Sequence, residues 1–279
     1  MRGRAAALAF LLLLLLPMAG GAAPPEAPSL QVSGAVEQGA LLRGTAPPGA
    51  VALTLDGEPL PLDPERRFLF GLDRDRTGTV LLVARLAGGG TLERRLDVRP
   101  RPWRIEHIAM ARPAGGPTEA FLRLREGELA RIAAARARDT GAKGWLQTFR
   151  WPAVGRISGR FGAQRVYRGQ PAAFHAGVDI AAGAGATVVA PADAVVVLAG
   201  PPAFSLEGNL VVLDHGMGLN SAFLHLATSA VVVGQRVRQG QPIGTVGMSG
   251  RATGPHLHWA MRWREARIDP APLAGPMPR

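Results

Sequence analysis

Five residues in the C-terminal half of the chain have types and spacing that suit metal chemistry. His175 and Asp179 lie four positions apart, His256 and His258 lie two positions apart, and His225 lies between the two pairs. Zinc binds imidazole nitrogens and carboxylate oxygens, and a site with three protein ligands keeps a fourth position open. The set is therefore large enough to hold a metal ion and to carry out chemistry beside it.

Strand geometry indicates which of these residues share a face, but it does not show which of them would bind the metal. Side chains alternate between the two faces of a strand, so His256 and His258 project together, and so do His175 and Asp179 if their segment is extended. Gly177, between the second pair, lets another backbone approach closely. Five candidates compete for three ligand places, and each motif alone also suits histidines that merely pack inside a strand.

The segment that carries these residues has the pattern of an antiparallel β-sheet. From residue 149 onward, short apolar runs rich in β-branched residues alternate with glycine and proline, at 157–161, 188–190, 195–198, 210–213, 230–233 and 243–246. Runs of this length bounded by turn residues are typical of strands. We therefore expect a mainly β protein whose C-terminal antiparallel β-sheet domain, residues 150–275, positions the histidines.

Residues 28–100 predict a second β unit. The stretch from Val51 to Leu55 alternates before Asp56-Gly57, a dipeptide that favours a two-residue hairpin turn. Several short strands at this spacing indicate a small Ig-like β-sandwich. It contains no cluster of catalytic residue types, so we expect a binding or spacer module.

A helical connector is expected between the two β units, over residues 101–149. Thr118 can cap a helix that runs to about Ala137, and Glu119 is favourable in its first turn. The helix is either a lid or a packing element between domains, and the second reading is preferred. His107 is the only histidine outside the C-terminal domain; a cap on the metal and a solvated surface residue are both considered for it, and the second is preferred.

The first 23 residues resemble an export signal. Arg2 and Arg4 precede an apolar run at 5–16, and small residues follow it at 19–23. Such a run is a signal-peptide pattern and is shorter than the roughly 20 residues of a membrane-spanning helix. We expect residues 1–23 to be a signal peptide, the protein to be exported to the periplasm or cell envelope, and no stable transmembrane anchor.

The composition limits which residues can bind a metal and which classes of partner are expected. The chain has no cysteine, so a zinc site must use histidine and carboxylate, and disulfides are excluded. The net charge of +11 favours an anionic cell-envelope surface, although an arginine-rich composition without a binding role is an equal alternative. Nucleic acid is not expected as a partner, because there is no basic stripe with interleaved aromatic residues.

The order of the motifs resembles the lysostaphin and LytM zinc endopeptidases, which cut peptide bonds in bacterial peptidoglycan. The resemblance runs from about Trp151 to Asp269. It rests on the segments His175-x-Gly-x-Asp179, Gly208-Asn209, Asp214-His215-Gly216, Phe223-Leu-His225-Leu226 and Gly250 to His258.

The resemblance implies a role for each site residue. One zinc ion per chain would be held by His175, Asp179 and His258, while His225 and His256 fall on the two catalytic positions that do not bind metal. Which of these two is the general base stays open. Asn209 either lines a substrate groove or makes a turn. The implied substrates are peptidoglycan peptide stems or cross-bridges.

Two other classes of function are considered. Some relatives with this fold are non-enzymatic and bind or activate other cell-wall hydrolases; these typically lose ligands, whereas all five site residues are present here. A wall-binding protein with a structural metal is a third possibility, but an open coordination position argues against it. The sequence therefore favours a zinc-dependent peptidoglycan endopeptidase.

Overall fold

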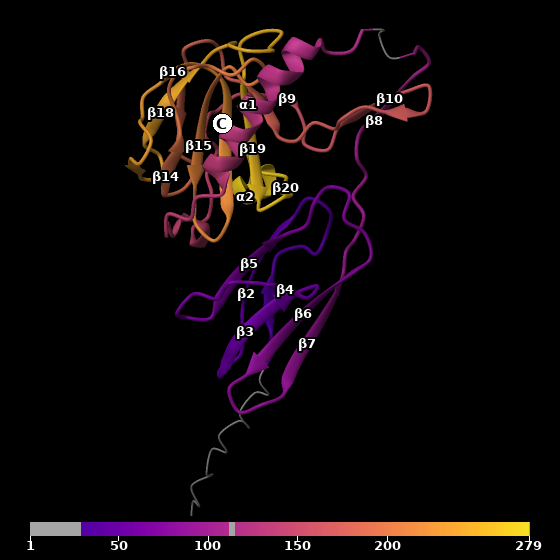
Figure 1. Cartoon of the computed structure of the whole chain (residues 1–279), viewed down its shortest axis with the longest axis vertical. Helices are drawn as coiled ribbons and strands as arrows, with labels where there is room; N and C mark the ends of the chain where they lie inside the picture. Colours follow the sequence, from indigo (N-terminus) through magenta and orange to yellow (C-terminus); the bar gives the residue numbers. More distant parts are fainter. Residues whose placement is uncertain (1–28, 112–114, 279) are drawn as a thin grey trace, which may run out of the picture.

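The computed structural model describes residues 29–111 and 115–278, so the expected signal peptide at residues 1–23 lies outside the described residues. The protein is mainly β, as expected, with the N-terminal strands below a larger C-terminal sheet in Figure 1. None of the helices in the described ranges combines the length and the apolar character that crossing a bilayer requires.

The N-terminal part consists of two small antiparallel sheets. The first has the order β1-β2-β5 and the second β4-β3-β6-β7. Their bounds are β1 Gln31–Ser33, β2 Leu41–Thr45, β3 Ala50–Leu55, β4 Glu58–Pro59, β5 Arg67–Gly71, β6 Thr79–Leu86 and β7 Thr91–Asp97. Strand β6 buries Val80, Leu82 and Ala84, every second residue, as a sheet with one buried face requires. The Ig-like character of this unit stays a prediction.

The predicted hairpin turn is present between β3 and β4. Leu55 pairs with Glu58, so Asp56 and Gly57 are the two turn residues. Both have positive φ angles, 51° and 86°, which a type I′ turn requires.

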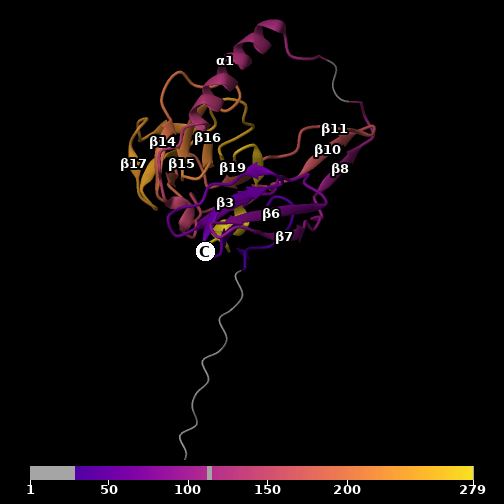
Figure 2. The same ribbon diagram turned by 60° about the horizontal axis from the view of Figure 1, so that its bottom comes forward.

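The connector contains a helix, as expected, but also a strand. The helix α1 spans Glu119–Arg136, and the Thr118 side chain accepts a hydrogen bond from the Phe121 amide. Strand β8, Ile105–Ile108, pairs in parallel with β10, Gln164–Tyr167, and β10 pairs with β11, Gln170–Pro171. Figures 1 and 2 both show β8 and β10 side by side, away from the large sheet. The connector therefore contains a strand in addition to the expected helix.

A ten-stranded sheet forms the C-terminal part. Its main path is β17-β14-β15-β16-β19-β12-β9, while β18 pairs with β13 and β16, and β20 pairs with β19. The bounds are β9 Arg156–Gly159, β12 Val178–Ala181, β13 Thr187–Val189, β14 Ala194–Leu198, β15 Asn209–Asp214, β16 Leu219–Ser229, β17 Arg236–Val237, β18 Pro242–Val246, β19 Leu257–Trp263 and β20 Ala266–Ile268. The short helices η1, Gly144–Leu146, and α2, Ala271–Ala274, flank it.

The two parts share one continuous apolar core. Strand β5 packs against β19 and β20, and a Cβ atom on Gly71 would lie 2.6 Å from Ile268 Cδ1. Polar contacts surround this junction: Arg267 pairs with Asp73, and Arg101 pairs with Asp269, N···O 2.9 Å. The N-terminal sheets therefore pack directly against β19, the strand that carries His258.

His215 is a core residue and not part of the site. Its side chain is fully buried just after β15; Nδ1 donates to the Asp193 carbonyl at 3.1 Å, and Nε2 accepts from the Ser221 hydroxyl at 2.7 Å. Burial lowers the pKa of His215 to about 4. His215 is therefore a packed histidine at the end of a strand.

The depressed pKa of His215 should make the free energy of unfolding depend on pH. A histidine in the unfolded chain binds a proton below about pH 6.5, whereas the folded protein resists protonation until about pH 4. The contribution of His215 to the free energy of unfolding is therefore fully present above pH 6.5. It is lost as the pH drops toward 4, by about 3 kcal/mol in total. Denaturant unfolding of wild type and His215→Gln at pH 7 and pH 5 checks this, and equal losses in both proteins would contradict it.

Candidate metal centre

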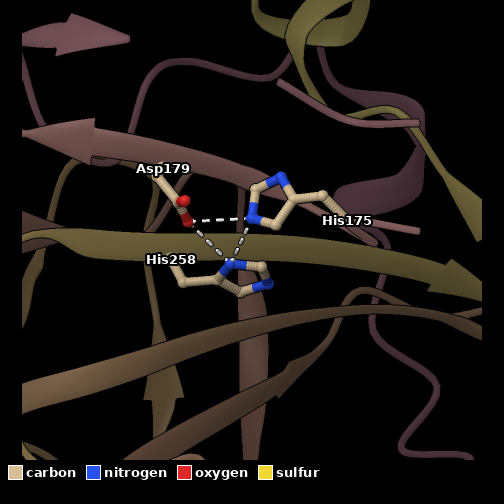
Figure 3. A group of neighbouring side chains, drawn as sticks. All are labelled: His175, Asp179 and His258. Atoms are coloured by element: carbon tan, nitrogen blue, oxygen red, sulfur yellow. Dashed lines mark hydrogen bonds and ion pairs between the residues drawn. The ribbon is translucent and has the colours of Figure 1, made fainter. Parts of the chain in front are cut away.

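Three side chains converge on one point beside the large sheet. His175 lies just before β12, Asp179 on β12 and His258 on β19, and the antiparallel register sets Asp179 opposite His258. Figure 3 shows the three side chains pointing toward one another. Asp179 Oδ1 lies 3.0 Å from His175 Nε2 and 2.8 Å from His258 Nδ1, and the two nitrogens are 3.1 Å apart. These residues are called the triad below.

The triad fits a metal ion. Ligand atoms at 2.0–2.2 Å from a tetrahedral zinc lie about 3.3–3.6 Å from one another, so a small outward movement of the three donor atoms would admit one. His175 Nδ1 donates to the Arg160 carbonyl at 3.0 Å, which leaves Nε2 as the free ligand nitrogen. A hydrogen bond of this kind orients a ligand histidine.

Electrostatics place Asp179 and His258 in ligand form at neutral pH. Burial lowers the pKa of His175, but contact with Asp179 outweighs this and raises the pKa above its usual value. Burial raises the pKa of Asp179, but the contacts of its carboxylate with His175 and His258 outweigh this and hold the pKa well below its usual range. Burial lowers the pKa of His258. Metal binding needs an ionised carboxylate and neutral imidazole, so Asp179 and His258 need no proton loss near pH 7.

The two remaining histidines lie against the triad. The ring centroids of His225 and His256 are 4.9 Å apart, and those of His225 and His258 are 6.3 Å apart. His256 Nε2 lies 3.8 Å from Asp179 Oδ1. In both residues Nδ1 donates to a backbone carbonyl at 2.8 Å, Ser249 for His225 and Gly254 for His256. Each therefore keeps Nε2 as a proton acceptor.

Comparison with known proteins places this arrangement in a family. The family described as Peptidase family M23 matches residues 173–270, which contain all five site residues. This segment is an M23 peptidase domain. The predicted resemblance to the lysostaphin and LytM type is thereby confirmed at the level of the family.

The curated relatives match less than half of the chain. The DD-carboxypeptidase/endopeptidase Mpg of Neisseria meningitidis is 38% identical over 127 residues, 44% of this chain and 28% of Mpg. The peptidoglycan DD-endopeptidase ShyA of Vibrio cholerae is 36% identical over 129 residues, 44% and 30% of the two chains. The murein hydrolase activator NlpD of Escherichia coli is 34% identical over 125 residues, 45% and 31%. The chain thus spans less than a third of the length of these relatives.

A solved structure matches most of the chain. The crystal structure of a putative peptidase M23 from Pseudomonas aeruginosa has a TM-score of 0.64 and 29% identity. The match covers 86% of this chain and 95% of that one. The likeness therefore extends beyond the M23 domain to the N-terminal part, and it supports the mainly β fold.

The backbone of the M23 domain is strained at His225. This residue has a φ of 63° within β16, where the register with the neighbouring strands shifts. A left-handed conformation costs a residue other than glycine on the order of 1 kcal/mol and is common at functional sites. The bulge re-aims the His225 side chain, as bulges beside active sites do. No signal in the sequence indicates it.

Helix α1 fixes the loop behind His225. The His225 amide donates to the Glu207 carbonyl at 2.9 Å, and Arg125 of α1 binds the Glu207 carboxylate through two hydrogen bonds, 2.7 and 2.9 Å. Glu128 of the same helix accepts from the Ser205 amide and hydroxyl, both at 2.6 Å. The connector helix therefore packs against the M23 domain. Its support of a site residue is what sequence reasoning did not foresee.

The triad lies at a cleft of about 730 Å³. His175 and Asp179 line it, together with Ile157, Ser158 and Gly159 of the edge strand β9. A free strand edge beside a metal triad suits a substrate that binds in extended form, because the edge offers unpaired backbone groups.

Two further candidates lie outside the triad. The Asn209 side-chain amide donates to the backbone carbonyls of Leu226 and Ala227, at 3.0 and 3.2 Å, so it supports the bulge in β16. Its role in substrate binding stays a prediction. His107 lies exposed on β8. Among the described residues, the group that could hold a metal ion consists of the triad and does not include His107.

Proposed function

We propose that this protein is a zinc-dependent endopeptidase that hydrolyses peptide bonds in peptidoglycan cross-links in the periplasm or cell envelope. The triad with two further histidines beside it carries this proposal. The names of the relatives Mpg and ShyA support the reaction and the substrate. The absence of cysteine leaves histidine and carboxylate as the metal donors, a set that suits zinc.

The residues of the site have separable tasks. His175, Asp179 and His258 would hold the zinc ion; when bound, it supplies Lewis acidity that polarises a carbonyl and lowers the pKa of water. One of His225 and His256 accepts a proton from the attacking water through Nε2 and delivers it to the leaving amine. The other donates a hydrogen bond from Nε2 to the developing oxyanion, which requires its protonated form because Nδ1 is already engaged by a backbone carbonyl. Burial lowers the pKa of His225, which keeps it neutral near pH 7.

The second candidate function is a non-enzymatic activator of other cell-wall hydrolases. The similarity to the activator NlpD motivates it. The presence of all five site residues around one point favours the enzyme, because an activator needs neither a metal triad nor two proton-transferring histidines.

Digestion of purified sacculi distinguishes the two functions. The full chain loaded with zinc is expected to release soluble peptide fragments, because the triad and both histidines are in place. A chelator should abolish this release, and added zinc should restore it. Chromatography and mass spectrometry of the released fragments provide the measurement, and the double variant His225→Ala/His256→Ala is the control. Release only when a second hydrolase is added would establish the activator instead.

A further inference from the structure

The cleft beside the triad carries an excess of positive charge. Four arginines line it, Arg104, Arg160, Arg165 and Arg251, against the acidic residues Glu106 and Asp179. Glu106 pairs with Arg165, N···O 3.0 Å, and Asp179 belongs to the triad. No acidic side chain in the described ranges forms an ion pair with the other three arginines.

Each of the three arginines is adjacent to a part of the site. Arg104 immediately precedes β8, and its carbonyl accepts from the Gln164 amide of β10 at 3.0 Å. The Arg160 carbonyl accepts from His175 Nδ1. Arg251 follows Ser249, whose carbonyl accepts from His225 Nδ1, by two residues. The three backbones are therefore held in place, while their side chains are exposed to solvent in the cleft.

The chain has 32 basic residues against 21 acidic ones, so unpaired arginines are expected in many places on its surface. The position of three of them in the cleft is what indicates a binding role. Both acidic groups of the cleft are engaged, so three positive charges lie around the triad without local compensation. Like charges gathered in one concave site repel one another and attract anions. Guanidinium groups bind carboxylates through paired, charge-assisted hydrogen bonds.

We propose that Arg104, Arg160 and Arg251 bind carboxylates of the substrate. The preferred substrate is therefore a cross-linked peptide with free carboxylate groups near the scissile bond, and neutral chains such as oligoglycine bridges are poor substrates. This substrate preference rests on the proposed endopeptidase function. The arginines act in binding and take no part in the proton transfers.

Two synthetic cross-linked peptides test the proposal if they are identical except that the side carboxylates of one are amidated. The zinc-loaded full chain is expected to cleave the carboxylate form with kcat/KM about tenfold higher, mainly through a lower KM, since exposed charge pairs contribute modestly. Raising the salt concentration should reduce the preference, because ions screen exposed charges. The triple variant R104Q/R160Q/R251Q should lose the preference, because its KM for the carboxylate form rises.

A matched control separates this effect from net charge. Arg156, Arg236 and Arg238 are exposed and do not line the cleft, so R156Q/R236Q/R238Q removes the same charge and should keep the preference. Equal cleavage of both peptides by the wild type, with chelator sensitivity intact, would overturn the substrate preference and leave the proposed function standing.

A binding measurement keeps the proposal testable without turnover. Fluorescence anisotropy with the two labelled peptides and chelator-treated protein should show about tenfold tighter binding of the carboxylate form. The triple variant R104Q/R160Q/R251Q should bind the two forms equally. If the protein cleaves neither peptide but binds them with this difference, the endopeptidase function fails and the assignment of the arginines stands. Equal affinity of the wild type for both peptides overturns the assignment.

Discussion

Replacing His258 with alanine is expected to abolish zinc binding and activity together. His258 Nδ1 is one of the three donor atoms of the triad, beside His175 Nε2 and Asp179 Oδ1. The variant therefore retains two ligands where three protein ligands define a catalytic site. Zinc content after dialysis, measured by atomic absorption, checks the prediction. The wild type should retain one zinc ion per chain and His258→Ala close to none.

The neighbouring variant His256→Ala provides the matched control. His256 lies two residues away and beside the triad, but Nδ1 is engaged by the Gly254 carbonyl and the residue is not among the donors. This variant should retain zinc and lose activity by about 100-fold or more, the range of a lost acid or base. If the two variants retained zinc equally, the division of the histidines into ligands and proton carriers would be wrong.

The second large effect is expected from a single added methyl group, in Gly177→Ala. A Cβ atom at this position would lie 2.6 Å from His258 Nε2 and 2.6 Å from the Trp259 carbonyl oxygen. Trp259 is fully buried and pairs with Val178 across the strands, so neither backbone can move without disturbing the register. The substitution should lower the free energy of unfolding by about 2 to 3 kcal/mol, as overpacking does, and weaken zinc binding at least tenfold.

Gly254→Ala is the control for this steric argument. Gly254 lies in the same domain close to His256, and nothing is within 4 Å of an added Cβ atom. Thermal unfolding and zinc titration of both variants provide the measurement. Comparable losses in the two variants would show that general sensitivity to glycine replacement, and not the clash with His258, causes the effect.

The sequence was most informative where spacing and local turn chemistry decide the structure. The β-branched runs predicted the large sheet, Asp56-Gly57 predicted its turn, and Thr118 predicted the start of α1. For the site, alternation in strands grouped the residues in pairs, but only the family resemblance suggested which three form the triad. The structure brings all five together because β12 and β19 pair with Asp179 opposite His258.

The features that sequence reasoning missed depend on contacts between distant residues. Strand β8 is short and exposed on both faces, so it shows no alternation, and its pairing with β10 spans almost 60 positions. Arg125 and Glu207 are 82 residues apart. The positive φ of His225 has little sequence signal, because glycine is the residue that indicates such a conformation, and asparagine, aspartate and histidine do so only weakly.

The position of helix α1 determines which segment of this protein could be exchanged with another protein. The helix precedes the M23 domain in the chain, yet Ile132 and Ala135 share an apolar cluster with Val197, Leu210, Val212 and Ala222 of the large sheet and with Phe204 of the loop before β15. A fragment that begins at residue 150 would leave this face of the sheet uncovered and the Glu207 carboxylate without its arginine. In a recombination between proteins, the helix and the sheet that it covers must therefore be transferred together if the site is to keep its support.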